Sequence, residues 1–81
     1  MRARANTESA KQSRIVSPMP GKITSIAVRA GDAVRERDLL LVLEAMKMEH
    51  RIEAPRDGII QTIHVLPEAL VIKGARLIDL A

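Results

Sequence analysis

The chain has 81 residues, of which 47% are hydrophobic, none is aromatic and none is cysteine, so it allows one small domain with an aliphatic core and no disulfide or thiolate metal site. The formal net charge is +3, but residues 1–14 hold four basic groups and one acidic group, which leaves the rest neutral and without the basic, aromatic-bearing face of a nucleic-acid-binding protein. No segment approaches the ~20 apolar residues of a membrane-spanning helix, and the lack of cysteine favours a reducing compartment such as the cytoplasm.

Residues 1–14 contain almost no large apolar side chain and are rich in Arg, Ser, Thr, Asn and Gln. Such a segment cannot bury enough surface to order itself, so we expect a flexible N-terminal tail or linker. A mitochondrial targeting segment is the less favoured alternative, because the stretch is Arg-rich but has no apolar face. The folded domain is expected to span residues 15–81.

From residue 15 onward the sequence repeats itself with a shift of 37 positions and no gap. Two similar halves of short strands and turns indicate an all-β structure with a pseudo-twofold axis, in which neither half buries its apolar face alone. The matched pairs include Pro18 and Pro55, Gly21 and Gly58, Ile23 and Ile60, Val34 and Val71, Leu40 and Leu77, and Leu43 and Leu80.

The turns of the two halves are alike at some points and different at others. Residues 18–21 and 55–58 each combine Pro and Gly just before an apolar strand. By contrast, the mate of Gly31 is Glu68, and the mate of Gly74 is Arg37. The local turn geometry at these two pairs is therefore in question.

Residues 39–54 read as two strands joined by a tight turn. Residues 39–43 are an apolar run of strand length, and residues 49–54 alternate between charged and mostly apolar positions. Pairing the strands about a two-residue turn at Met46 and Lys47 gives one mostly apolar face. In this register Leu43 lies opposite His50, Leu41 opposite Ile52, Leu39 opposite Ala54, and Glu44 opposite Glu49. The like-charged glutamates require an exposed, water-screened tip.

The turn residues are unusual for a hairpin. Tight hairpin turns prefer Asn-Gly or Asp-Gly because both central residues take positive φ, and Met46-Lys47 offers neither. Backbone strain of this kind clusters at functional sites. Two large apolar side chains, Met46 and Met48, also flank a lysine that we expect to be highly exposed, above largely buried Leu41, Leu43 and Ile52. The stretch is built to display one amine.

The segment Glu44-Ala45-Met46-Lys47-Met48 resembles the biotin attachment motif of biotin carboxyl carrier domains, most closely those of acyl-CoA carboxylases, and the resemblance extends over about residues 15–81. It implies that Lys47 carries covalent biotin, with Glu44, Ala45, Met46 and Met48 as its flanking site residues. It also implies a flattened β-barrel, or sandwich, of two four-stranded antiparallel sheets. There is no room between Val28 and Val34 for the thumb insertion of some bacterial carriers.

The implied function is a non-catalytic carrier that moves carboxybiotin between the active sites of a biotin carboxylase and a carboxyltransferase. A biotin protein ligase would load it, and the carboxyl acceptor would most often be an acyl-CoA, with urea and pyruvate as others. A lipoyl-type carrier of a 2-oxo acid dehydrogenase-like complex is the alternative on the same scaffold, although Met-Lys-Met argues for biotin. A β interaction module with an unmodified lysine is a third hypothesis.

Other chemistry is not indicated. His50 and His64 are single histidines on strands with no second ligand at metal spacing, although His50 lies close enough to Lys47 for a proton-transfer role to be considered. No Ser/His/Asp set, cysteine nucleophile or phosphate-binding glycine loop is present. We therefore expect neither a metal nor catalysis by this chain alone.

Overall fold

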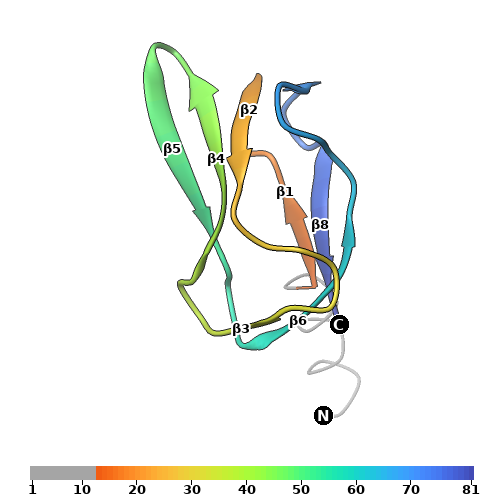
Figure 1. Ribbon diagram of the computed structural model, residues 1–81. Helices are drawn as coiled ribbons and strands as arrows, with labels where there is room; N and C mark the ends of the chain where they lie inside the picture. The colour runs from red at the N-terminus through yellow and green to blue at the C-terminus, as the bar shows by residue number, and fades with distance from the viewer. Residues whose placement is uncertain (1–12) are drawn as a thin grey trace, which may run out of the picture.

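The computed structural model describes residues 13–81, which form eight β-strands and no helix (Figure 1). Arg14, assigned to the tail from its composition, is instead the first residue of the first strand; the rest of the predicted tail, residues 1–12, lies outside the described residues. The strands are β1 (Arg14–Val16), β2 (Gly21–Ile26), β3 (Ala33–Val34), β4 (Leu39–Ala45), β5 (Met48–Glu53), β6 (Gly58–Ile63), β7 (Leu70–Val71) and β8 (Arg76–Leu80).

The strands form two four-stranded antiparallel sheets, as the resemblance to carrier domains implies, and their orders are β1-β8-β6-β3 and β5-β4-β2-β7. Adding 37 to the first residues of β2, β3 and β4 gives those of β6, β7 and β8, so each sheet has the same plan. The registers agree as well: Ile23 faces Leu43 in one sheet, and Ile60 faces Leu80 in the other. The sequence repeat is therefore a structural twofold.

An aliphatic core lies between the two sheets, and most of it comes from matched positions of the two halves. Successive side chains of a strand point to opposite faces of the sheet, so every second side chain lies on the inner face. The least exposed members are Ile23, Leu40, Leu41, Leu43, Ile60, Leu77 and Ile78, all at 0–1% exposure. Burial of this set fixes the strand registers, because a one-residue slip would turn a strand's apolar side chains to water.

The turns that differ in sequence keep the same geometry. Gly31 and its mate Glu68 have φ of 96° and 75°, and Arg37 and its mate Gly74 have φ of 74° and 86°. The hydrogen bonds are equivalent too, since the amide of Arg37 donates to the Ala54 carbonyl and that of Gly74 donates to the Ser17 carbonyl. Glu68 and Arg37 therefore adopt a backbone conformation suited to glycine, and the turn geometry is the same in both halves.

Replacing Arg37 by glycine is therefore expected to stabilise the domain. A non-glycine residue in the left-handed region costs about 1–2 kcal/mol, and the extra freedom of glycine in the unfolded chain offsets about 0.5–1 kcal/mol of that relief. Denaturant unfolding should show a gain of roughly 0.5–1 kcal/mol. Gly74→Ala is the matched control: no atom lies within 4 Å of the place that the new methyl group would take, so only the φ strain should lower its stability. A less stable Arg37→Gly protein would contradict this account.

The closed turn between β4 and β5 lies at one end of the molecule, and the C-terminus lies at the other, near the start of β1 (Figure 1). This arrangement follows from the twofold, because the symmetry mate of the β4–β5 hairpin is the antiparallel pair β8 and β1, which has no connecting turn. The position of Lys47 is thus at the end opposite to Ala81.

Candidate functional site: an exposed lysine on a strained hairpin turn

The β4–β5 hairpin has the predicted register near its tip. Leu41 faces Ile52, Leu43 faces His50, and Glu44 faces Glu49. The expected pair of Leu39 with Ala54 is wrong, because Leu39 faces Glu53 after a register shift between Leu39 and Leu41.

The shift is explained by burial of two consecutive leucines. Leu40 and Leu41 are both at 0% exposure, which regular alternation along a strand does not allow. A β-bulge, in which one strand has an extra residue, resolves the conflict. Beyond it, Ala54 is buried and its amide donates to the Asp38 carbonyl at 2.9 Å. The base of the hairpin is thereby bent into the core.

The turn between β4 and β5 has the positive φ angles expected of a tight hairpin turn, although its residues rarely adopt them. Met46 and Lys47 have φ of 54° and 66°, the signs of a type I′ turn without Asn or Gly. Lys47 is exposed, as expected, and Leu41 and Leu43 are fully buried, whereas Ile52 is only half-buried. The lysine amine therefore projects from a turn whose preceding strand, β4, is anchored in the core.

The residues flanking Lys47 divide sharply by exposure. Ala45 is 5% exposed, whereas Met46 is 86% and Met48 is 63% exposed. Met48 lies opposite Ala45 in the strand pairing, but only the small alanine is covered and the longer methionine side chain extends into solvent. Both thioether side chains are therefore available for contacts with a bound group or a partner.

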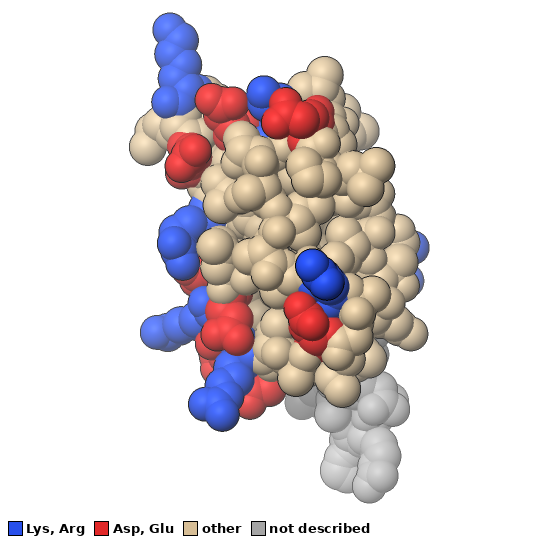
Figure 2. All heavy atoms as spheres, viewed as in Figure 1, with Lys and Arg blue, Asp and Glu red and all other residues tan. Residues whose placement is uncertain are grey.

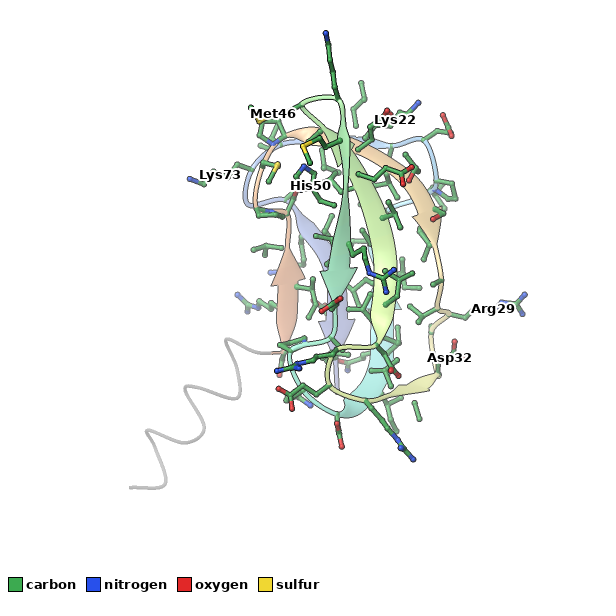
Figure 3. The ribbon with its side chains drawn as sticks, turned by 90° about the vertical axis from the view of Figure 1, so that its left-hand side faces the viewer. Lys22, Arg29, Asp32, Met46, His50 and Lys73 are labelled. Atoms are coloured by element: carbon green, nitrogen blue, oxygen red, sulfur yellow. The ribbon has the colours of Figure 1, made fainter. Side chains whose placement is uncertain are left out.

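Two contacts hold the strand that leads into the turn. A Cβ atom on Gly21 would lie 2.5 Å from the Glu44 carbonyl oxygen, so β2 approaches β4 more closely than any other residue would permit. On the other side, the His50 imidazole Nε2 lies 3.3 Å from the Ala45 carbonyl oxygen (Figure 3 shows His50 near the tip). A carbonyl only accepts hydrogen bonds, so Nε2 carries the proton in this contact. This structural contact of His50 is one that sequence reasoning missed.

His50→Ala is expected to loosen the turn without unfolding the domain. The bond is long and half-exposed, and a net hydrogen bond contributes about 0.5–1.5 kcal/mol, so the loss should fall near the low end. Amide hydrogen exchange at residues 46–48 should become faster, while exchange in β6 and β8 stays unchanged. His64→Ala is the matched control, because His64 bonds to Asp79 at 2.9 Å on the other sheet. Equal effects of both variants at the turn would contradict this role.

Charged side chains surround the turn. Glu44 and Glu49 face each other as predicted, Lys22 faces Glu44 from β2, and the Lys22 amine lies 3.3 Å from a Glu68 carboxylate oxygen. Figure 2 shows acidic side chains gathered at the end of the molecule that carries the hairpin. Within residues 13–81 there is no group of three or more His, Asp or Glu that could hold a metal ion. The chemistry available at this tip is therefore that of a displayed primary amine.

Comparison with known proteins agrees with this architecture. The family described as "Biotin-requiring enzyme", the biotin/lipoyl family, matches residues 13–80, nearly all of the described chain. The chain therefore belongs to the biotin/lipoyl family. The same fold occurs in the segments of two solved carboxylases with which the chain superposes, a long-chain acyl-CoA carboxylase and the Kluyveromyces lactis urea carboxylase.

Among its relatives, a biotin carboxyl carrier protein of Streptococcus mutans is 45% identical over 80% of this chain and 50% of its own length. The methylmalonyl-CoA decarboxylase subunit gamma of Veillonella parvula is 54% identical over 57% of this chain and 36% of its own length. A single-chain, multi-domain long-chain acyl-CoA carboxylase superposes with a TM-score of 0.76 at 29% identity, covering 80% of this chain and 6% of that one.

The chain spans half or less of the length of these relatives. The matched region is thus one domain of a much larger enzyme in the case of the acyl-CoA carboxylase. In the part of the chain that the structure describes, no helix is long and apolar enough to cross a membrane.

Proposed function

We propose that this chain is a biotin carboxyl carrier in which Lys47 bears biotin through an amide bond, with Glu44, Ala45, Met46 and Met48 as the surrounding site. The observation that carries the proposal is the exposed Lys47 at positive φ between two solvent-exposed methionines, on a hairpin held by a buried Ala45. Family membership and the carrier proteins among the relatives support biotin as the group attached.

The residues fit the attachment chemistry. A ligase that activates the biotin carboxyl group with ATP presents a biotinyl-adenylate, and the neutral Lys47 amine attacks its carbonyl carbon. The C–N bond forms, the bond to AMP breaks, and the amine loses a proton to solvent. The chain contributes access and a fixed direction of approach, because the strained turn and the Ala45 and Gly21 contacts hold the lysine backbone still.

When bound, biotin supplies a ring nitrogen that accepts a carboxyl group in one active site and gives it up in another. The chain's part is delivery: a tethered group is presented at a local concentration of roughly millimolar. The partners are a biotin protein ligase, a biotin carboxylase and a carboxyltransferase, and the acceptor is most often an acyl-CoA. Each partner receives the exposed tip, while the opposite end with Ala81 points away (Figure 1).

Loading in cells tests this proposal. The chain is co-expressed with a biotin protein ligase and analysed by intact mass and by a streptavidin blot. The expected result is a mass increase of one biotinyl group and a positive blot. A lipoyl mass would support the lipoyl-type carrier instead, and a bare Lys47 in cells that load a known carrier would support the unmodified interaction module.

A further inference from the structure

A shallow groove of about 530 Å³ begins at the attachment lysine itself. Its lining includes Lys47 and Met46 from the turn, Lys22 and Glu44 from the adjoining strands, and Leu70 and Val71 from β7. In Figure 3, Lys22 and Met46 both lie at the level of the hairpin tip. The proposed function gives the lysine a cargo but assigns no role to this groove.

The strand pairing sets three different side chains in a row across the groove. Lys22 faces Leu70 of β7 on one side and Glu44 of β4 on the other. Cross-strand neighbours point to the same face of a sheet, so the row runs from an aliphatic side chain to an ammonium group to a carboxylate. Leu70 is 83% exposed, so its side chain offers an apolar surface beside the two charged groups.

This row matches the chemistry of a biotinyl group. The ligand has an apolar fused ring and a urea whose carbonyl accepts hydrogen bonds and whose N–H groups donate them. Leu70 and Met46 offer apolar contact, Lys22 offers a donor for the urea carbonyl, and the Glu44 carboxylate offers an acceptor for urea N–H. Lys22 already approaches Glu68 at 3.3 Å, which holds its amine over this part of the surface.

We propose that the groove between Lys47 and Leu70 is a resting site for the chain's own biotinyl group between visits to partner active sites. This inference rests on the proposed function and adds to it a second, non-covalent site. The attachment point lines the groove, so the tether needs no rearrangement of the barrel to bring the ring onto Leu70.

The resting site works only because the ligand is tethered. An open groove of this kind binds a free ligand weakly, but the tether supplies roughly millimolar local concentration. A groove with a Kd of about 1 mM for free biotin would then be about half occupied. Release at such an occupancy costs little free energy, so the site shelters apolar surface without hindering transfer.

The test is a comparison of methyl chemical shifts in three states of the full chain: biotin-loaded wild type, unloaded wild type, and Lys47→Gln. The glutamine variant removes the lysine charge as acylation does but carries no ring. The expected result is that Leu70 and Val71 methyl signals of the loaded chain differ from those of both other states, with nuclear Overhauser effects from Leu70 to the biotin ring. Leu66 and Ile72, 75% and 73% exposed but outside the groove, should not shift.

A second variant keeps the test independent of the turn. Leu70→Ser is expected to remove the loading-dependent shift of Val71 while biotin incorporation stays at the wild-type level, and Leu66→Ser is expected to leave the shift intact. Loaded protein with Leu70 and Val71 signals equal to those of Lys47→Gln would overturn the resting site alone. A Lys47 that stays unloaded would overturn the proposed function and, with it, this inference.

Discussion

Lys47→Arg is expected to abolish biotin incorporation and leave the fold intact. The guanidinium group of arginine stays protonated in proteins and does not attack an activated carboxyl carbon, so charge is kept and acylation is lost. Because residue 47 is exposed and lies outside the hydrophobic core, the turn strain and the barrel should be unchanged. The measurement is intact mass and streptavidin blotting after co-expression with a biotin protein ligase.

The matched controls are the other two lysines in the described part of the chain. Lys22→Arg, which changes a half-exposed amine in the groove that Lys47 also lines, and Lys73→Arg, which changes an exposed amine outside that groove, should both keep full labelling. Thermal unfolding of all three variants should coincide within a few tenths of a kcal/mol of wild type, as for surface substitutions. Persistent streptavidin detection of Lys47→Arg would show that the attachment site is elsewhere.

Gly21→Ala is expected to cause the second large effect, a loss of about 1–3 kcal/mol of folding free energy, the range for overpacked sites. The new Cβ would meet the Glu44 carbonyl oxygen at 2.5 Å, and a backbone atom cannot rotate away. The strand must shift where it leads into the Met46–Lys47 turn. We therefore expect slower biotin loading as well as a lower midpoint in denaturant unfolding.

The pseudo-twofold supplies a control for this prediction. Gly58 is the symmetry mate of Gly21, but its methyl position lies 2.7 Å from the end of the Arg56 side chain and 3.2 Å from the Ala81 carbonyl oxygen. The guanidinium group can move, so Gly58→Ala should cost less than Gly21→Ala and should not slow loading. Equal losses, or slower loading in Gly58→Ala alone, would contradict the role assigned to the Gly21 contact.

Much of the fold was readable from periodic features. The shift of 37 predicted the twofold, and the Pro and Gly positions predicted the starts of β2 and β6 at Gly21 and Gly58. The position of the turn and the pairs around it followed from alternation after residue 48. The type I′ signs of φ at Met46 and Lys47 followed from the length of the turn alone.

The features that the sequence did not predict correctly, or did not predict at all, depend on contacts that no local sequence pattern marks. Leu39, Leu40 and Leu41 are identical, so nothing in the run marks the bulge that breaks the pairing of Leu39 with Ala54. Arg37 and Glu68 take glycine-like φ because their amides donate hydrogen bonds to the carbonyls of Ala54 and Ile23, residues distant in the sequence, so the cause is tertiary. The row from Leu70 to Glu44 joins residues of three strands, and only their lateral order brings those residues together.

The antiparallel pair β8 and β1, which no turn connects, lies at the end of the domain opposite to the turn that carries Lys47 (Figure 1). Leu80 donates its amide to the Ser13 carbonyl at 2.7 Å, so a short loop inserted between those strands would make a hairpin equivalent to the one that carries Lys47. A circularly permuted chain closed by Met-Lys at that place and cut at residues 46–47 would display its amine from the opposite pole. From this geometry we expect that the loading site can be moved to the other end of the domain. A ligase that labels the permuted chain would recognise the turn and the sheets around it rather than one fixed stretch of sequence.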